Sequence, residues 1–298
     1  MENSTRYAFA SIVGKPNAGK SSLLNALIGE KIAIISKKPQ TTRTKITGVL
    51  TTGITQFVFI DTPGLHKAKN KLSEYMLKQI DESFSDIDVA VLVTDMADEI
   101  FKSEIELIEN FKSKHIPAIL VINKIDTVKN KEKIAQRIKN FSDLFEFSAV
   151  IPMSILENDG VDILLKELEN HSFEGPHFFP DDTLTDQPER VIVAEIIREK
   201  ILNLMLDEIP HGIAVTIDSM KERENSDIMD INATIICERQ SHKGMIIGKG
   251  GKMLKEIGSL SRAEIESFLN IKVFLNCWVK VSEDWRKKEK IIKDFGFN

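Results

Sequence analysis

The sequence predicts an α/β domain, with a mostly parallel sheet covered by helices on both faces, followed by a smaller α+β domain. Three observations support this. Short apolar runs alternate with longer amphipathic stretches from residue 7 to about 171. A glycine-rich motif follows the first apolar run and opens the first amphipathic stretch. A segment at 173–189 then ends the alternation with three prolines, five acidic residues and no Lys or Arg.

That segment sets the domain boundaries. We expect a first domain over 1–172, a linker over 173–189 and a second domain over 190–298. A chain of 298 residues is long enough to bury two cores. Hydrophobic residues at 42% and charged residues at 29% are typical of an ordinary folded protein rather than a disordered or fibrous one.

Cysteine use and hydropathy indicate the compartment. Cys237 and Cys277 are far apart and lack metal-binding spacing, and the first residues lack the pattern of a secretory signal. No apolar run approaches the roughly 18 residues of a membrane span. We therefore expect a cytoplasmic protein, and weak peripheral contact with the inner face of the cell membrane stays open. We also expect a monomer, although the sequence does not reveal the oligomeric state.

The elements of the first domain follow in order. Apolar runs at 8–13, 57–60, 89–93 and 118–122 predict buried strands, and helical spacing predicts helices at 20–29, 70–84, 102–114 and 131–141. Ligands of parallel sheets bind beyond the carboxyl ends of the strands. Gly14, Asp61 and Asn123 each directly follow an apolar run, so we expect the site there.

The second domain has a different element order and charge. Its predicted elements are a helix at 191–207, strands at 212–220 and 228–238, two helices around a glycine turn, a strand at 272–281 and a basic helix through 285–290. Residues 239–298 contain 13 basic and 7 acidic residues, a balance of +6. Such a concentration favours a polyanion partner, although a solvated helix face would give the same pattern.

The glycine-rich motif has the form GxxxxGK[ST], in which backbone N–H groups surround phosphates. Lys20 can reach the β- and γ-phosphates, and the Ser21 hydroxyl can hold Mg²⁺. A strand before the motif and a helix after it supply the required context. The predicted phosphate-binding residues are Gly14, Lys15, Pro16, Asn17, Ala18, Gly19, Lys20, Ser21 and Ser22.

The motif Asp61-Thr62-Pro63-Gly64 ends the second apolar run. Asp61 is expected to hold a water on Mg²⁺, and the Gly64 N–H to contact the γ-phosphate, which makes the next segment a switch. A threonine must complete the metal shell, and we choose Thr42 over Thr41. Leu65 takes the position at which Ras-like enzymes carry the glutamine that orients water, so it cannot supply that group.

The base is selected by Asn123-Lys124-Ile125-Asp126. The Asp126 carboxylate can accept hydrogen bonds from guanine N1–H and its 2-amino group, whereas adenine offers neither. The Lys124 stem can pack across the base. These residues narrow the ligand to GTP and GDP. Ser154 is our choice for the loop that closes the guanine pocket, with Ser148 as the alternative.

A glycine turn between two apolar helical segments is the candidate RNA site. Such a GxxG turn lets a KH domain approach a nucleic-acid backbone and clamp about four nucleotides. An ordinary helix–turn–helix connection is the alternative. The predicted RNA-binding residues are Ile246, Ile247, Gly248, Lys249, Gly250, Gly251 and Lys252.

The motifs GxPNxGKS, TTR, DTPG and NKxD, in this order, resemble the TrmE-Era-EngA-like GTPases of ribosome assembly and tRNA modification. The resemblance implies slow GTP hydrolysis with a hydrophobic residue in place of the catalytic glutamine. It also implies K⁺ held partly by Asn17, unless Asn17 only braces the loop. The implied catalytic residues are Lys20, Thr42, Asp61, Gly64 and Asn17.

Over nearly its whole length the chain resembles members of this family that end in a type II KH domain. Val279-Lys280-Val281 and Trp285 belong to that match. The resemblance implies binding to the 3′ end of 16S rRNA in the immature 30S subunit, whereas the residues themselves indicate only single-stranded RNA. A tRNA-modification GTPase, or another ribosome-associated GTPase with a different RNA target, is the alternative.

Overall fold

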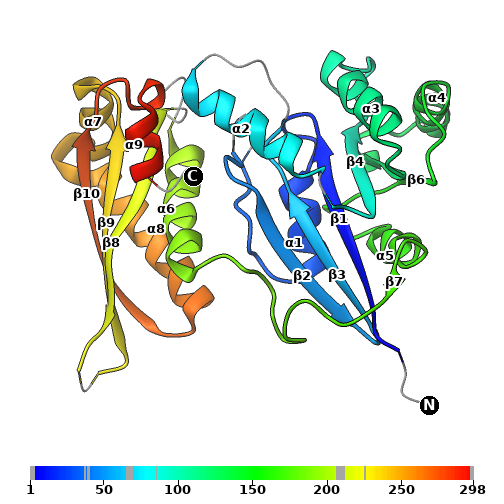
Figure 1. The fold of residues 1–298 in the computed structure, drawn as a ribbon. Coiled ribbons are helices and arrows are strands. Elements are labelled where there is room, and N and C mark those ends of the chain that lie inside the picture. Colours follow the sequence, from blue (N-terminus) through cyan, green and yellow to red (C-terminus); the bar gives the residue numbers. More distant parts are fainter. Residues whose placement is uncertain are drawn as a thin grey trace. The chain divides into compact units, whose positions relative to one another are not determined.

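The protein is described by a computed structural model that covers residues 4–36, 38, 41–64, 70–84, 86–205, 212–224 and 226–295 (Figure 1). It divides into two compact units. The first holds most of the described chain up to Asp186, and the second holds Gln187 onward together with the described parts of 34–41 and 69–75. The domain boundaries given above stay a prediction.

The first unit contains a sheet with strand order β2-β3-β1-β4-β5-β6. Its strands are β1 (Arg6–Gly14), β2 (Ile46–Thr52), β3 (Thr55–Asp61), β4 (Val89–Asp95), β5 (Ala118–Asn123) and β6 (Ala149–Pro152). Only β2 runs antiparallel to its neighbour within this order, and the other pairs are parallel. The expected mostly parallel sheet is confirmed. Strand β2 was not predicted, because its sequence ITGVLTT lacks a sustained apolar run.

Helices cover both faces of this sheet (Figure 1). They are α1 (Lys20–Ile28), α2 (Lys71–Glu82), α3 (Lys102–Lys114), α4 (Lys131–Ser142) and α5 (Val161–Glu169). Strand β4 shows how one strand serves two cores: Val91 and its odd-numbered neighbours pack with α1 and α5, whereas Leu92 packs with α3 and α4. This double burial explains the continuous apolar runs of the sequence.

Part of the predicted linker packs on the first unit. β7 (Phe173–Glu174) pairs antiparallel with β1, and the Val49 N–H donates to the Leu184 carbonyl at 2.8 Å. The Phe178 ring lies edge-on to Tyr7 and Phe9, with ring centroids 5.0 and 4.9 Å away. We call residues 173–186 the strap.

The second unit contains α6 (Glu189–Leu204), β8 (Ala214–Glu222), β9 (Ile228–Cys237), α7 (Gln240–Ile247), α8 (Lys252–Leu269), β10 (Lys272–Val281) and α9 (Glu289–Asp294). Its sheet has the order β10-β9-β8, with β10 parallel and β8 antiparallel to β9. The predicted element order of the α+β domain is therefore confirmed. No described helix is long and apolar enough to cross a membrane.

The C-terminal basic helix begins later than predicted. Trp285–Lys287 form a separate 3-10 turn, and α9 begins only at Glu289. The Trp285 ring is fully buried, and its indole N–H donates to the Gly212 carbonyl at 2.9 Å. Trp285 therefore anchors the end of the chain to the second unit instead of opening a helix.

Candidate functional site

The glycine-rich loop joins β1 to α1 at the carboxyl end of the sheet. Gly14 has φ 149° and Gly19 has φ 112°. A β-carbon on Gly14 would lie 2.1 Å from the Val93 carbonyl oxygen, and one on Gly19 would lie 2.3 Å from the Asn123 amide nitrogen. Both positions therefore require glycine, which allows the loop to approach β4 and the Asn123 side chain closely.

Lys20 is buried at the start of α1. Its ammonium group donates to the carbonyl oxygens of Gly14 and Lys15 at 3.1 and 3.0 Å. Burial lowers the pKa of Lys20 to about 8, and the nearby Asp61 carboxylate acts in the opposite direction. A cation held this way beside a glycine-rich loop suits the phosphates of a nucleotide.

Three oxygen-bearing side chains meet beside this lysine. The Ser21 hydroxyl donates to Asp61 Oδ2 at 2.7 Å and lies 2.8 Å from the Thr42 hydroxyl. The Thr42 hydroxyl therefore lies within this cluster, whereas the Thr41 hydroxyl donates to the Lys38 carbonyl at 2.6 Å. Burial raises the pKa of Asp61 to about 6, against the influence of Lys20.

This oxygen cluster fits Mg²⁺. Asp61 Oδ1 is buried and has no hydrogen-bond partner among the described residues, so it is free to orient a metal-bound water. Hydroxyl and carboxylate oxygens are the ligands that Mg²⁺ prefers. Gly64 packs against the loop, since a β-carbon there would lie 2.9 Å from the Pro16 Cα atom. Leu65 lies outside the described residues.

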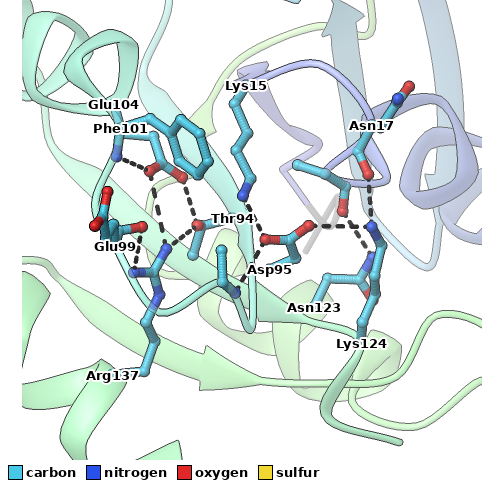
Figure 2. Close-up of polar contacts among 12 residues, drawn as sticks. Lys15, Asn17, Thr94, Asp95, Glu99, Phe101, Glu104, Asn123, Lys124 and Arg137 are labelled. Atoms are coloured by element: carbon cyan, nitrogen blue, oxygen red, sulfur yellow. Dashed lines mark hydrogen bonds and ion pairs between the residues drawn. The ribbon is translucent and has the colours of Figure 1, made fainter. Parts of the chain in front are cut away.

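The predicted base-recognition motif, residues 123–126, forms hydrogen bonds with the glycine-rich loop (Figure 2). The Asn123 amide donates to the Ala18 carbonyl at 2.9 Å, and the Lys124 ammonium donates to the Asn17 carbonyl at 2.7 Å. The Ser154 hydroxyl donates to Asp126 Oδ1 at 2.7 Å. This contact favours Ser154 over Ser148 as the partner of the base-reading carboxylate.

The glycine turn of the second unit joins α7 to α8. Gly248, Gly250 and Gly251 all have positive φ, at 72°, 60° and 76°, and Lys249 and Lys252 are exposed. Ile246 requires a correction: its side chain is fully buried in the core, so it supports the turn instead of contacting RNA. Ile247 is half-buried and stays a candidate.

Beside this turn lies a groove of about 390 Å³ between α8 and β10, which was not predicted. The helical spacing of Lys255, Gly258 and Arg262 could have revealed the side formed by α8. The residues that line the groove are Gly251, Leu254, Lys255, Gly258, Ser259, Arg262, Phe274, Leu275 and Cys277.

Family models match both parts of the chain. A model described as a 50S ribosome-binding GTPase matches residues 9–124, and a KH domain model matches residues 208–286. GTPase Era of Ruminiclostridium cellulolyticum is 47% identical over 294 residues, covering 99% of this chain and 98% of that protein. GTPase Era of Clostridioides difficile is 48% identical over 293 residues, covering 98% and 99%.

Two solved structures are similar over the whole chain. One is Era in complex with MgGDPNP and nucleotides 1506–1542 of 16S ribosomal RNA, and the other is Aquifex aeolicus Era bound to GDP and AlF4⁻. Each has a TM-score of 0.95 and 37% identity, and covers 98% of this chain and 99% of that chain.

Proposed function

The chain belongs to the Era family of GTPases, and we propose that it binds the 3′ end of 16S rRNA and assists assembly of the small ribosomal subunit in the cytoplasm. Its GTPase activity follows from the family. The observation that carries the proposal is similarity over the full length to an Era crystallised with that RNA segment.

The second unit supplies the chemistry for this RNA. The glycine turn lets a sugar–phosphate backbone come close, and Lys249 and Lys252 attract its charge. In the adjoining groove, exposed Lys255 and Arg262 can contact phosphates, while the half-exposed Phe274 ring offers a stacking surface for a base. A groove with these properties suits a single strand better than a duplex.

For catalysis we propose that Ser21 and Thr42 hold Mg²⁺ directly and that Asp61 holds it through water. When bound, the ion would neutralise negative charge on the phosphates, and Lys20 would share that role. The Gly64 N–H contacts the γ-phosphate. We assign binding of the guanine base to Asn123, Lys124, Asp126 and Ser154.

We also propose that K⁺ near Asn17, whose backbone has φ 62°, accelerates hydrolysis. Multiple-turnover rates in KCl and NaCl at equal ionic strength test this, with the higher rate expected in KCl. Equal rates would leave Asn17 with a bracing role only.

A second candidate function is a ribosome-associated GTPase with a different RNA target. The description of the matching GTPase family model, which names the 50S ribosome, favours it. That model covers only the first unit, whereas similarity to the RNA-bound Era also covers the second unit. We therefore rank the 16S rRNA target first.

Filter binding separates the two candidates. The probes are an oligonucleotide of the 3′ end of 16S rRNA, the same nucleotides in scrambled order, and a segment of 23S rRNA. Each is tested with GTP, GDP and no nucleotide. Preferential binding of the 16S oligonucleotide is expected, with an affinity that depends on the nucleotide. Equal binding of all three RNAs would contradict the proposed target.

A further inference from the structure

Asp95 ends strand β4 between the two loops that contact the nucleotide. Strand β4 pairs with β1 on one side, where Val93 lies opposite Gly14. It pairs with β5 on the other, where Asp95 itself lies opposite Asn123. Strand β4, and Asp95 at its end, therefore lies between the strands that lead into the phosphate loop and the base-recognition loop.

The two carboxylate oxygens of Asp95 contact one loop each. Oδ1 lies 2.5 Å from the ammonium of Lys15 in the phosphate loop, and Oδ2 lies 3.1 Å from the ammonium of Lys124 in the base-recognition loop. Figure 2 shows the carboxylate between the two lysines. The Lys124 ammonium also donates to the Asn17 carbonyl, so it contacts both Asp95 and the phosphate loop.

Two of the three side chains are largely shielded from water, whereas that of Lys124 is 40% exposed. The side chains of Asp95 and Lys15 are only 18% and 9% exposed, and the Lys15 ammonium lies 4.3 Å from the centre of the Phe101 ring. Burial acts to raise the pKa of Asp95, but the two ammonium groups outweigh it and hold that pKa below its ordinary value. Without the carboxylate, no negative charge would stand between the Lys15 and Lys124 ammonium groups, which repel each other.

The segment that follows Asp95 is held by buried charges from α3 and α4. Glu104 accepts from the Thr94 hydroxyl at 2.5 Å and from the Phe101 N–H at 2.8 Å. The Arg137 guanidinium donates to the Thr94 hydroxyl and to the Glu99 carbonyl, both at 2.9 Å. These bonds fix the end of β4, and with it the direction of the Asp95 side chain (Figure 2).

We propose that Asp95 is a positioning residue for guanine-nucleotide binding, which joins Lys15 and Lys124 so that the phosphate loop and the base-recognition loop close on the nucleotide together. It acts through these lysines. None of its described contacts involves Ser21, Thr42 or Asp61, so the chemical step depends on it little.

A simple charge-balancing role makes the opposite prediction. A carboxylate beside a phosphate site repels the nucleotide, so its removal would strengthen binding if Asp95 only neutralised the lysines. If Asp95 positions the two loops, its removal weakens binding despite the gain in positive charge. The sign of the change in affinity therefore separates the two roles.

The test is Asp95→Asn in the full-length protein, with stopped-flow kinetics of a fluorescent GDP derivative. We expect a dissociation rate constant roughly tenfold higher, with association unchanged or slightly faster, because loop closure governs escape. Single-turnover hydrolysis at saturating GTP should change less than roughly twofold. The matched control is Asp98→Asn, which removes the same charge from an exposed position in the same loop and should leave dissociation unchanged.

Asp95→Glu keeps the charge but moves the carboxylate by one methylene. The positioning role predicts that this variant also releases GDP faster, by roughly threefold or more, and the charge-balancing role predicts no change. This second variant decides the question if nucleotide-free circular dichroism shows that Asp95→Asn fails to fold. Slower or unchanged GDP release in the folded variants would overturn the proposal.

Discussion

We propose that a single carboxylate, that of Asp126, reads the base, and one hydroxyl contacts it. Ser154 donates to Asp126 Oδ1, which leaves Oδ2 and the remaining lone pairs of Oδ1 to accept from guanine. Asp126 is exposed at the edge of the site, so it can meet a ligand without rearrangement. Specificity of this kind comes from the pairing of donors with acceptors, and exchanging one acceptor for a donor should change the preferred base.

We expect Asp126→Asn to lower the affinity for GTP by at least roughly a hundredfold and to favour XTP. An amide offers an N–H where guanine presents its own N–H groups, whereas xanthine carries an oxygen at the 2-position. Competition of GTP, XTP and ATP against a fluorescent GDP derivative measures the preference. A variant that still preferred GTP would exclude Asp126 as the base-reading residue.

Individual residues of the site were predictable from the sequence where they belong to one continuous motif. Gly14 to Ser21 and Asn123 to Asp126 form continuous motifs, so their spacing was visible in the sequence. The contacts of Asp95 were not, because Lys15, Asp95 and Lys124 come from three separate segments. The cluster of Glu104, Thr94 and Arg137 was hidden for the same reason: its members are brought together only by tertiary packing.

At the scale of elements, the strap is the clearest departure from sequence expectation. Proline and acidic residues predicted a linker, yet residues 173–186 bond along β1, β2 and β3. Strand β2 and helix α5 also escaped prediction, since one is polar in part and the other spans only Val161–Glu169. Sequence periodicity indicates which face of a helix or strand is buried. It does not indicate which backbone groups form hydrogen bonds with a neighbouring segment.

Gln56 is the residue of β3 that holds the strap. Its fully buried side chain accepts from the N–H groups of Phe178 and Phe179 at 2.8 and 3.0 Å and donates to the Phe179 carbonyl at 2.9 Å. Gln56→Ala should cost roughly 2–4 kcal/mol in free energy of unfolding, because these backbone groups lose their partners. Denaturant titration measures it. Gln136→Ala, on the exposed surface of α4, is the control, and an equal effect of both would contradict this role.

The strap should also respond to pH through His177. A hydrogen bond to Asp181, together with one to the Ile54 carbonyl, raises the pKa of His177 above its ordinary value of 6.5. A raised folded-state pKa means that this stabilisation is complete below 6.5 and is lost as pH rises through the folded-state pKa. The difference in thermal midpoint between the wild type and His177→Gln should therefore shrink as pH rises above 6.5. A constant difference would show that the pKa of His177 is the same in the folded and unfolded states, which would contradict this role.

For the whole molecule, the two units have separate cores and separate chemistry. In the first unit, charged side chains lie beside the phosphate loop. In the second unit, a glycine turn lies beside a groove that contains basic residues. Their order along the chain was predictable, because each unit has its own periodicity and its own motif. A change at the glycine turn should therefore affect RNA binding without affecting GTP hydrolysis.

Gly251 offers the sharpest separation of the two activities. Its φ of 76° is strained for any other residue, but a β-carbon there would meet no heavy atom within 4 Å. Gly251→Asp places a negative charge where we propose that an RNA phosphate approaches. Gly251→Asn adds the same strain and nearly the same volume without the charge.

We expect the Asp variant to bind the 16S oligonucleotide at least roughly tenfold more weakly than the Asn variant. In the absence of RNA, both variants should turn over GTP at a rate near that of the wild type. Equal RNA affinity of the two variants would contradict an electrostatic contact between RNA and this turn. Loss of GTP turnover would show that the two units do not act separately.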